Sequence, residues 1–129
     1  MDEAVLLARE AGIGAVGVHH SSHVGAAGAF VVEAARQGMI GLIMSNSDAA
    51  VSLFGGAQPF HGTNPIAMAA PVKNSDPWFM DIATSSIPFN RVTLYRSLGL
   101  LLPAGAAADN SGYATQDALA ASFLQPLGV

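Results

Sequence analysis

The residues best suited to chemistry lie in one short loop between an apolar segment and an amphipathic helix. The loop runs His20-Ser21-Ser22-His23-Val24-Gly25-Ala26-Ala27. The first turn of the helix, Gly25–Ala29, has only small residues, so we expect its free backbone N–H groups to be open to an anionic ligand. The helix dipole favours a phosphate or a carboxylate there. His23 is the candidate for a general acid or an anion contact.

The same histidines could instead bind a metal ion. His20 and His23 are three residues apart, His19 lies beside them, and His61 is far along the chain. The chain has no cysteine, and no carboxylate lies at metal-ligand spacing from the loop. We therefore expect no metal site, and the alternative to a catalytic or anion-binding role is a set of ordinary polar loop histidines.

Two further clusters combine polar side chains with apolar strands. In Phe60-His61-Gly62-Thr63-Asn64-Pro65-Ile66-Ala67, a hydroxyl and an amide come directly before a predicted strand. This turn either offers hydrogen bonds to a ligand or is purely structural. In Met80-Asp81-Ile82-Ala83-Thr84-Ser85-Ser86, a carboxylate lies inside an apolar strand. Asp81 is either a satisfied edge residue or an acceptor for a ribose or amide group.

Helices and strands alternate around these clusters. Apolar residues at helical spacing predict the helix after the histidine loop, ending near Gln37 with Gly38 as its stop. Three other helices are predicted. One covers Glu3–Ala11 and is closed by Gly12; a second has Pro88 in its first turn, continues over Val92–Leu98 and ends at Gly99; a third is a short capped helix over Thr115–Ala121. Predicted strands are Ile13–Val18, Met39–Met44 (buried), Pro65–Ala70 and Trp78–Ala83, with a loop over Leu53–Asn64 and a turn over Asp109–Gly112. This order predicts an α/β fold, a mixed sheet with helices on at least one face.

Length, composition and charge exclude several classes of protein. With 129 residues we expect a single domain over 1–129. The chain is 51% hydrophobic and only 11% charged, which predicts either an alanine-rich small domain or a surface buried against further chain or a partner. No apolar run reaches the roughly 18 residues of a membrane helix. Five unclustered Lys and Arg residues argue against nucleic-acid binding, and the absence of cysteine and of a secretory signal favours a cytoplasmic protein.

Taken in order, these motifs resemble one family, the malate/L-lactate dehydrogenase-like oxidoreductases, which includes ureidoglycolate dehydrogenase, diketogulonate reductase and cyclic imino-acid reductases. The resemblance covers nearly the whole chain. It rests on Gly12–Val18, Ser22-His23, Gly38–Leu42, Gly55-Gly56-Ala57, Gly62–Ala67, Asp81–Ser85 and Leu102-Pro103. It implies a non-Rossmann domain that binds NAD or NADP, in keeping with the absence of a Gly-x-Gly-x-x-Gly loop.

The resemblance also implies roles for individual residues. His23, Val24, Gly25, Ala26 and Ala27 would line the cofactor, and Asp81, Ile82 and Ala83 would form a second cofactor contact. Thr63, Phe89 and Asn90 would contact the substrate. Arg91 stands where the imino-acid reductases have an acidic relay residue, so the identity of the substrate stays open.

Members of this family are considerably longer than this chain. Their catalytic Ser-His pair lies in an N-terminal region without a counterpart here, so the resemblance assigns no catalytic residue within this chain, and His23 stays a candidate from the interpretation of its loop. Their Gly-His-Lys-Gly motif is expected just after Leu127-Gly128. We therefore predict a truncated NAD(P)-binding domain of an oxidoreductase that transfers hydride between nicotinamide and a small 2-hydroxy or 2-oxo acid, or a related imino acid.

The resemblance also implies that the full-length protein is a homodimer, with its active site near the subunit interface. The isolated chain should be nearly inactive, because hydride transfer needs cofactor, acid and acid-base residue held together. The alternative is a non-catalytic remnant that acts only as a binding or oligomerisation module.

Overall fold

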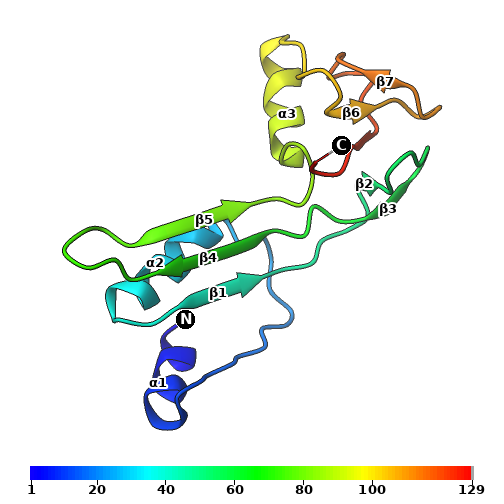
Figure 1. Ribbon diagram of the computed structural model, residues 1–129. Coiled ribbons are helices and arrows are strands. Elements are labelled where there is room, and N and C mark those ends of the chain that lie inside the picture. Colours follow the sequence, from blue (N-terminus) through cyan, green and yellow to red (C-terminus); the bar gives the residue numbers. More distant parts are fainter. Residues whose placement is uncertain (129) are drawn as a thin grey trace. The chain divides into compact units, whose positions relative to one another are not determined.

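The computed structural model describes residues 1–128, which fold into an α/β arrangement of helices and two sheets (Figure 1). The helices are α1 (Asp2–Ala11), α2 (Ala27–Arg36) and α3 (Phe89–Leu98). The strands are β1 (Gly41–Met44), β2 (Val51–Ser52), β3 (Pro59–His61), β4 (Ile66–Ala70), β5 (Trp78–Ile82), β6 (Ala107–Ala108), β7 (Ala114–Thr115) and β8 (Phe123–Leu124). The predicted α/β class with flanking helices is therefore confirmed.

The chain divides into two compact units, each built from two separate stretches of sequence. The first unit comprises Met1–Ser45 and Ile66–Ile82. The second unit comprises Asn46–Pro65 and the chain from Ala83 onward. The cofactor residues predicted at His23–Ala27, Asp81 and Ile82 thus belong to the first unit, whereas Ala83 and the substrate residue predicted at Thr63 belong to the second.

In the first unit, α2 packs against one face of an antiparallel sheet with the strand order β1-β4-β5 (Figure 1). Val31 of α2 is fully buried and packs with Ala67 and Ala69 of β4. Helix and sheet approach closely at Gly41, where an added Cβ would lie 2.8 Å from the Val31 carbonyl oxygen. Small side chains therefore let α2 lie directly on the sheet.

The opposite face of this sheet is also apolar. The strand register places Leu42, Met68 and Met80 in one row across it and Met44, Ile66 and Ile82 in the next. Leu42 is 54% and Met44 is 65% exposed. The predicted strand over Met39–Met44 forms, but its description as a buried strand is wrong, because alternate residues face away from α2.

In the second unit, α3 and a five-stranded sheet enclose a separate core. The strand order is β3-β2-β8-β6-β7, and the pairing of β2 with β8 is parallel while the other pairings are antiparallel. Val92 of α3 is buried in the same cluster as Val51 of β2 and Leu124 of β8. The sheet is therefore mixed, as predicted, and it joins strands far apart in the sequence.

Helix ends are predicted well because their signals are local. Helix α1 ends at Gly12, whose φ of 82° is left-handed and whose N–H donates to the Ala8 carbonyl. Helix α2 ends before Gly38, which has the same φ, and α3 ends at Gly99 with a φ of 65°. Glycine reaches this region without strain, so these three endings confirm the predictions.

Three segments differ from the prediction. Ile13–Val18 is extended but is no strand, and Ile13 is 80% exposed, because apolar content alone supplies no pairing strand. The loop over Leu53–Asn64 contains β3, which pairs with β2. Thr115–Ala121 is no helix: β7 ends at Thr115, and Asp117 closes a turn by accepting the Leu119 N–H at 2.8 Å.

In the described part of the chain, no helix combines the length and the apolar character needed to span a membrane.

Candidate functional site

The histidine loop precedes α2 and is ordered by its own hydrogen bonds. His23 Nδ1 accepts the N–H of Gly25 at 2.9 Å, and Gly25 adopts a left-handed φ of 74°. His19 Nδ1 and His20 Nδ1 are 2.8 Å apart. All three histidines are exposed. The loop therefore presents its imidazole rings at the surface directly before the small residues of the helix start.

Within residues 1–128, no three His, Cys, Asp or Glu side chains come together in a way that could hold a metal ion. The histidines of the loop lie in the first unit and His61 lies in the second. Its Nδ1 is 2.8 Å from the Gly62 carbonyl oxygen.

The start of α2 is already occupied by a carboxylate of the chain itself. Asp81 Oδ2, on the edge strand β5, accepts the N–H of Gly28 at 2.7 Å, across 53 residues of sequence. A Cβ at Gly28 would lie 3.1 Å from that oxygen, so a larger residue there would push the Asp81 side chain away by a few tenths of an ångström. The expectation that this helix start is open to any anion is therefore wrong at Gly28, because an acidic side chain caps it.

The bond from Gly28 to Asp81 brings two predicted cofactor segments together, since His23–Ala27 leads directly into the capped turn. Asp81 is interpreted from the sequence as either a satisfied edge residue or a ligand acceptor. The first interpretation fits its Oδ2 atom, which accepts the Gly28 N–H. The other interpretation, an acceptor for a ribose or amide group, stays a prediction. Ile82 ends β5 in the first unit, whereas Ala83 begins the second stretch of the other unit.

Replacing Asp81 with alanine should destabilise the first unit by about 1 kcal/mol, the usual effect of removing a helix N-cap. Asp81→Asn should retain most of that stability, because its amide oxygen can still accept the Gly28 N–H. Urea denaturation followed by far-UV circular dichroism measures both. Glu10→Ala, an exposed acidic residue of α1, is the control. Equal midpoints for Asp81→Ala and this control would contradict the capping role.

In the second unit, both backbone groups of Thr63, its N–H and its carbonyl, form hydrogen bonds. Its N–H donates to Ser47 Oγ at 3.0 Å. Its carbonyl accepts both the N–H of Thr84 at 2.8 Å and the Thr84 hydroxyl at 2.9 Å. The predicted substrate residues Phe89 and Asn90 open α3 of the same unit and are exposed. The second unit therefore contains all three residues that the resemblance assigns to the substrate.

Ser47 is the residue of this site that the sequence analysis did not single out. Its hydroxyl oxygen lies 3.3 Å from Thr63 Oγ1, and its N–H donates to Asn64 Oδ1 at 3.1 Å. The available signal was its place in a polar stretch, Ser45–Asp48, after β1. Nothing in that stretch distinguishes Ser47 from its neighbours, because the contact spans 16 residues.

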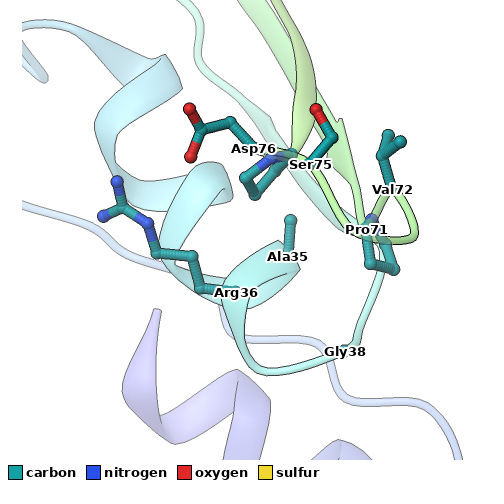
Figure 2. A pocket seen from close by; sticks show the side chains of 8 residues that line it. Ala35, Arg36, Gly38, Pro71, Val72, Ser75 and Asp76 are labelled. Atoms are coloured by element: carbon teal, nitrogen blue, oxygen red, sulfur yellow. The ribbon is translucent and has the colours of Figure 1, made fainter.

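A cavity of about 310 Å³ lies at the C-terminal end of α2, beside the turn between β4 and β5 (Figure 2). The charged ends of Arg36 and Asp76 lie on the same side of it. Arg36 also pairs with Glu33 at 3.9 Å. None of the residues that line this cavity is among the functional residues predicted from the sequence.

The fold and these segments define an α/β protein whose candidate ligand loop differs from a Rossmann Gly-x-Gly-x-x-Gly turn. The model of the malate/L-lactate dehydrogenase family matches residues 1–129, and the chain belongs to this family. This confirms the family resemblance drawn from the motifs.

Individual relatives agree with this assignment. The malate dehydrogenase of Pyrococcus abyssi is 41% identical, and the match covers 99% of this chain and 36% of that protein. The (2R)-3-sulfolactate dehydrogenase (NADP(+)) of Chromohalobacter salexigens is 40% identical over 99% of this chain and 39% of its own length. The chain thus spans little more than a third of the curated relatives it matches.

Solved structures show the same fold. The malate dehydrogenase of Entamoeba histolytica superposes with a TM-score of 0.89 at 31% identity, covering 98% of this chain and 37% of that one. The Δ1-piperideine-2-carboxylate reductase of Pseudomonas syringae gives 0.87 at 39% identity, covering 94% and 37%.

Proposed function

We propose that this chain is the NAD(P)-binding segment of an oxidoreductase that transfers hydride between nicotinamide and a small 2-hydroxy or 2-oxo acid, or a related imino acid. The observation that carries the proposal is the bond from Gly28 to Asp81, which joins the two segments assigned to the cofactor. The relatives are named as dehydrogenases or reductases of malate, sulfolactate, ureidoglycolate and pyrroline-2-carboxylate, and some of these names include NAD(+) or NADP(+).

The residues of the first unit fit the uncharged parts of a dinucleotide better than its phosphates. Asp81 can accept from a ribose hydroxyl or an amide, whereas a phosphate at the start of α2 would meet its negative charge. The small residues from Gly25 to Ala27 let a ligand approach the backbone closely. The cofactor would supply the hydride, and this chain would bind and orient it while Thr63, Phe89 and Asn90 contact the acid.

We further propose that residues 1–129 represent a single cofactor-binding domain of a cytoplasmic protein that is a homodimer at full length. The apolar outer face of the β1-β4-β5 sheet supports a state in which more polypeptide covers it, because exposed apolar patches of this kind mark interaction surfaces. The same face favours the alternative function, a binding or oligomerisation module without chemistry. The two functions differ in whether the folded chain binds a nucleotide.

Titration with NADH and with NADPH, followed by nucleotide fluorescence, tests the proposal. We expect saturable binding that His23→Ala weakens by about fivefold or more, the equivalent of one lost hydrogen bond. His23→Asn should keep the loop turn, because asparagine can accept the Gly25 N–H as histidine does, and should still bind less tightly if the imidazole contacts the cofactor. His19→Ala is the control for removing an exposed imidazole from the same loop.

The outcomes separate the two functions. A folded chain that binds neither nucleotide contradicts the cofactor proposal and favours the interaction module. If His23→Ala weakens nucleotide binding and His23→Asn does not, the role of His23 is to order the loop and not to contact the cofactor. With 2-oxo acids and NADH or NADPH, we expect the isolated chain to turn over almost no substrate.

A further inference from the structure

Ser47 and Thr63 form a pair of hydroxyl groups in the second unit. Their oxygen atoms are 3.3 Å apart, and Ser47 Oγ also accepts the Thr63 N–H at 3.0 Å. The backbone of Ser47 is fixed as well, because its N–H donates to Asn64 Oδ1 at 3.1 Å. Two consecutive residues, Thr63 and Asn64, therefore hold one serine at both its side chain and its main chain.

The backbone around this pair is shaped to allow the contact. Gly62 is buried, and a Cβ there would collide with the carbonyl oxygen and the hydroxyl of Ser47. Asn64 has a φ of 32°, in the left-handed region that non-glycine residues rarely adopt. It also precedes Pro65, which restricts it further. Such strain persists where the surrounding structure enforces it, and it is concentrated at functional sites.

The hydrogen-bond inventory of the pair shows what it can offer a ligand. Each hydroxyl has one proton to donate. Either hydroxyl can be the donor in the contact between them; when Ser47 donates to Thr63 Oγ1, the Thr63 proton is available to an outside acceptor. The pair is neutral and needs no proton exchange to donate. It therefore suits a negatively charged oxygen, for which a hydrogen bond is shorter and stronger than for a neutral one.

We propose that Ser47 is a positioning residue that holds the Thr63 hydroxyl toward the carboxylate of the acid substrate. This inference rests on the proposed function, in which Thr63 contacts the acid. Ser47 restricts the rotation of the Thr63 side chain through the contact between the hydroxyls, while Thr84 fixes the Thr63 carbonyl from the other side. The acid then meets a hydroxyl that is already oriented, which reduces the ordering required on binding.

Binding of oxamate, an unreactive analogue of a 2-oxo acid, tests this role in the intact chain. The shifts of the Thr63 amide in a ¹H–¹⁵N spectrum report the titration. We expect Ser47→Ala to weaken oxamate binding by about fivefold to tenfold, the effect of one hydrogen bond. Ser47→Thr, which keeps a hydroxyl, should rescue it. Ser97→Ala, an exposed serine of α3 that bonds the Leu94 carbonyl, is the matched control and should bind as the wild type does.

A double-mutant cycle separates positioning from general support of the fold. In a Thr63→Val background, which removes the hydroxyl, Ser47→Ala should have no further effect on oxamate binding. A purely structural serine would weaken binding by the same factor in both backgrounds, which would overturn the proposal. The NADH affinity of Ser47→Ala should equal that of the wild type, so that a general loss of folding is detected.

The remaining outcomes distinguish this inference from the function on which it rests. If the wild type binds oxamate and Ser47→Ala binds it equally well, the role of Ser47 is overturned and the proposed function stands. If the wild type binds NADH but no oxamate, the acid contact at Thr63 is wrong, and the positioning role is overturned with it.

Discussion

Replacing Gly62 with alanine should destabilise the second unit by about 3–5 kcal/mol. An added Cβ would collide with the Ser47 carbonyl and hydroxyl and would lie 2.6 Å from Asn64 Oδ1. Forcing one extra carbon into a closed site costs about 1–3 kcal/mol, and moving Ser47 away would also break its bonds to Thr63 and Asn64 at about 1 kcal/mol each. A shift of side chains cannot make room for the added methyl group, because one of the atoms it would meet is the backbone carbonyl oxygen of Ser47.

The free energy of unfolding in urea measures this effect. Gly17→Ala is the matched control, because a Cβ at Gly17 meets no atom within 4 Å. Its unfolding free energy should lie within about 0.5 kcal/mol of the wild-type value. A Gly62→Ala protein as stable as this control would contradict the close packing between Gly62 and Ser47.

Leu124→Ala should destabilise the second unit by about 2–5 kcal/mol, since it removes three buried carbons and leaves a cavity. Leu124 is fully buried on β8, where it pairs with Val51 of β2 and Ala107 of β6. It therefore lies where the parallel and the antiparallel parts of the five-stranded sheet meet. A change of this size is a large fraction of the stability of an ordinary domain.

Differential scanning calorimetry compares Leu124→Ala with Leu119→Ala. Leu119 has the same side chain but is 75% exposed, so its replacement should change the unfolding free energy by less than about 0.5 kcal/mol. If both variants melt together, Leu124 does not belong to the core of the second unit.

The sequence predicts the elements whose signals are local. The helical spacing from Ala27 to Ala35 and the stop at Gly38 define α2 within one residue of its observed end. The β4 and β5 strands are likewise predicted within a residue of their observed bounds. Ile13–Val18 has the composition of a strand, but a strand needs a partner to share its hydrogen bonds, and composition cannot supply one. At Thr115–Ala121, the capping signal of Asp117 serves a turn instead of a helix.

The candidate site follows the same division. Thr63 and Asp81 could be selected from the chain because a polar residue beside an apolar strand is visible in the sequence. Their partners could not, because Ser47 and Gly28 approach them from 16 and 53 residues away. Whether His23, Phe89 and Asn90 bind cofactor or substrate stays a prediction, and the nucleotide and oxamate titrations test it.

The interleaved connectivity of the two units has a consequence for the order of folding during synthesis. The β1-β4-β5 sheet is complete once residue 82 has left the ribosome, whereas β2 must wait for β8, its parallel neighbour across Val51 and Leu124. Until then the β2–β3 hairpin exposes an unpaired edge, which is the type of surface that promotes aggregation. We therefore expect a nascent chain stalled before Phe123 to recruit chaperones more strongly than one that extends past Leu124.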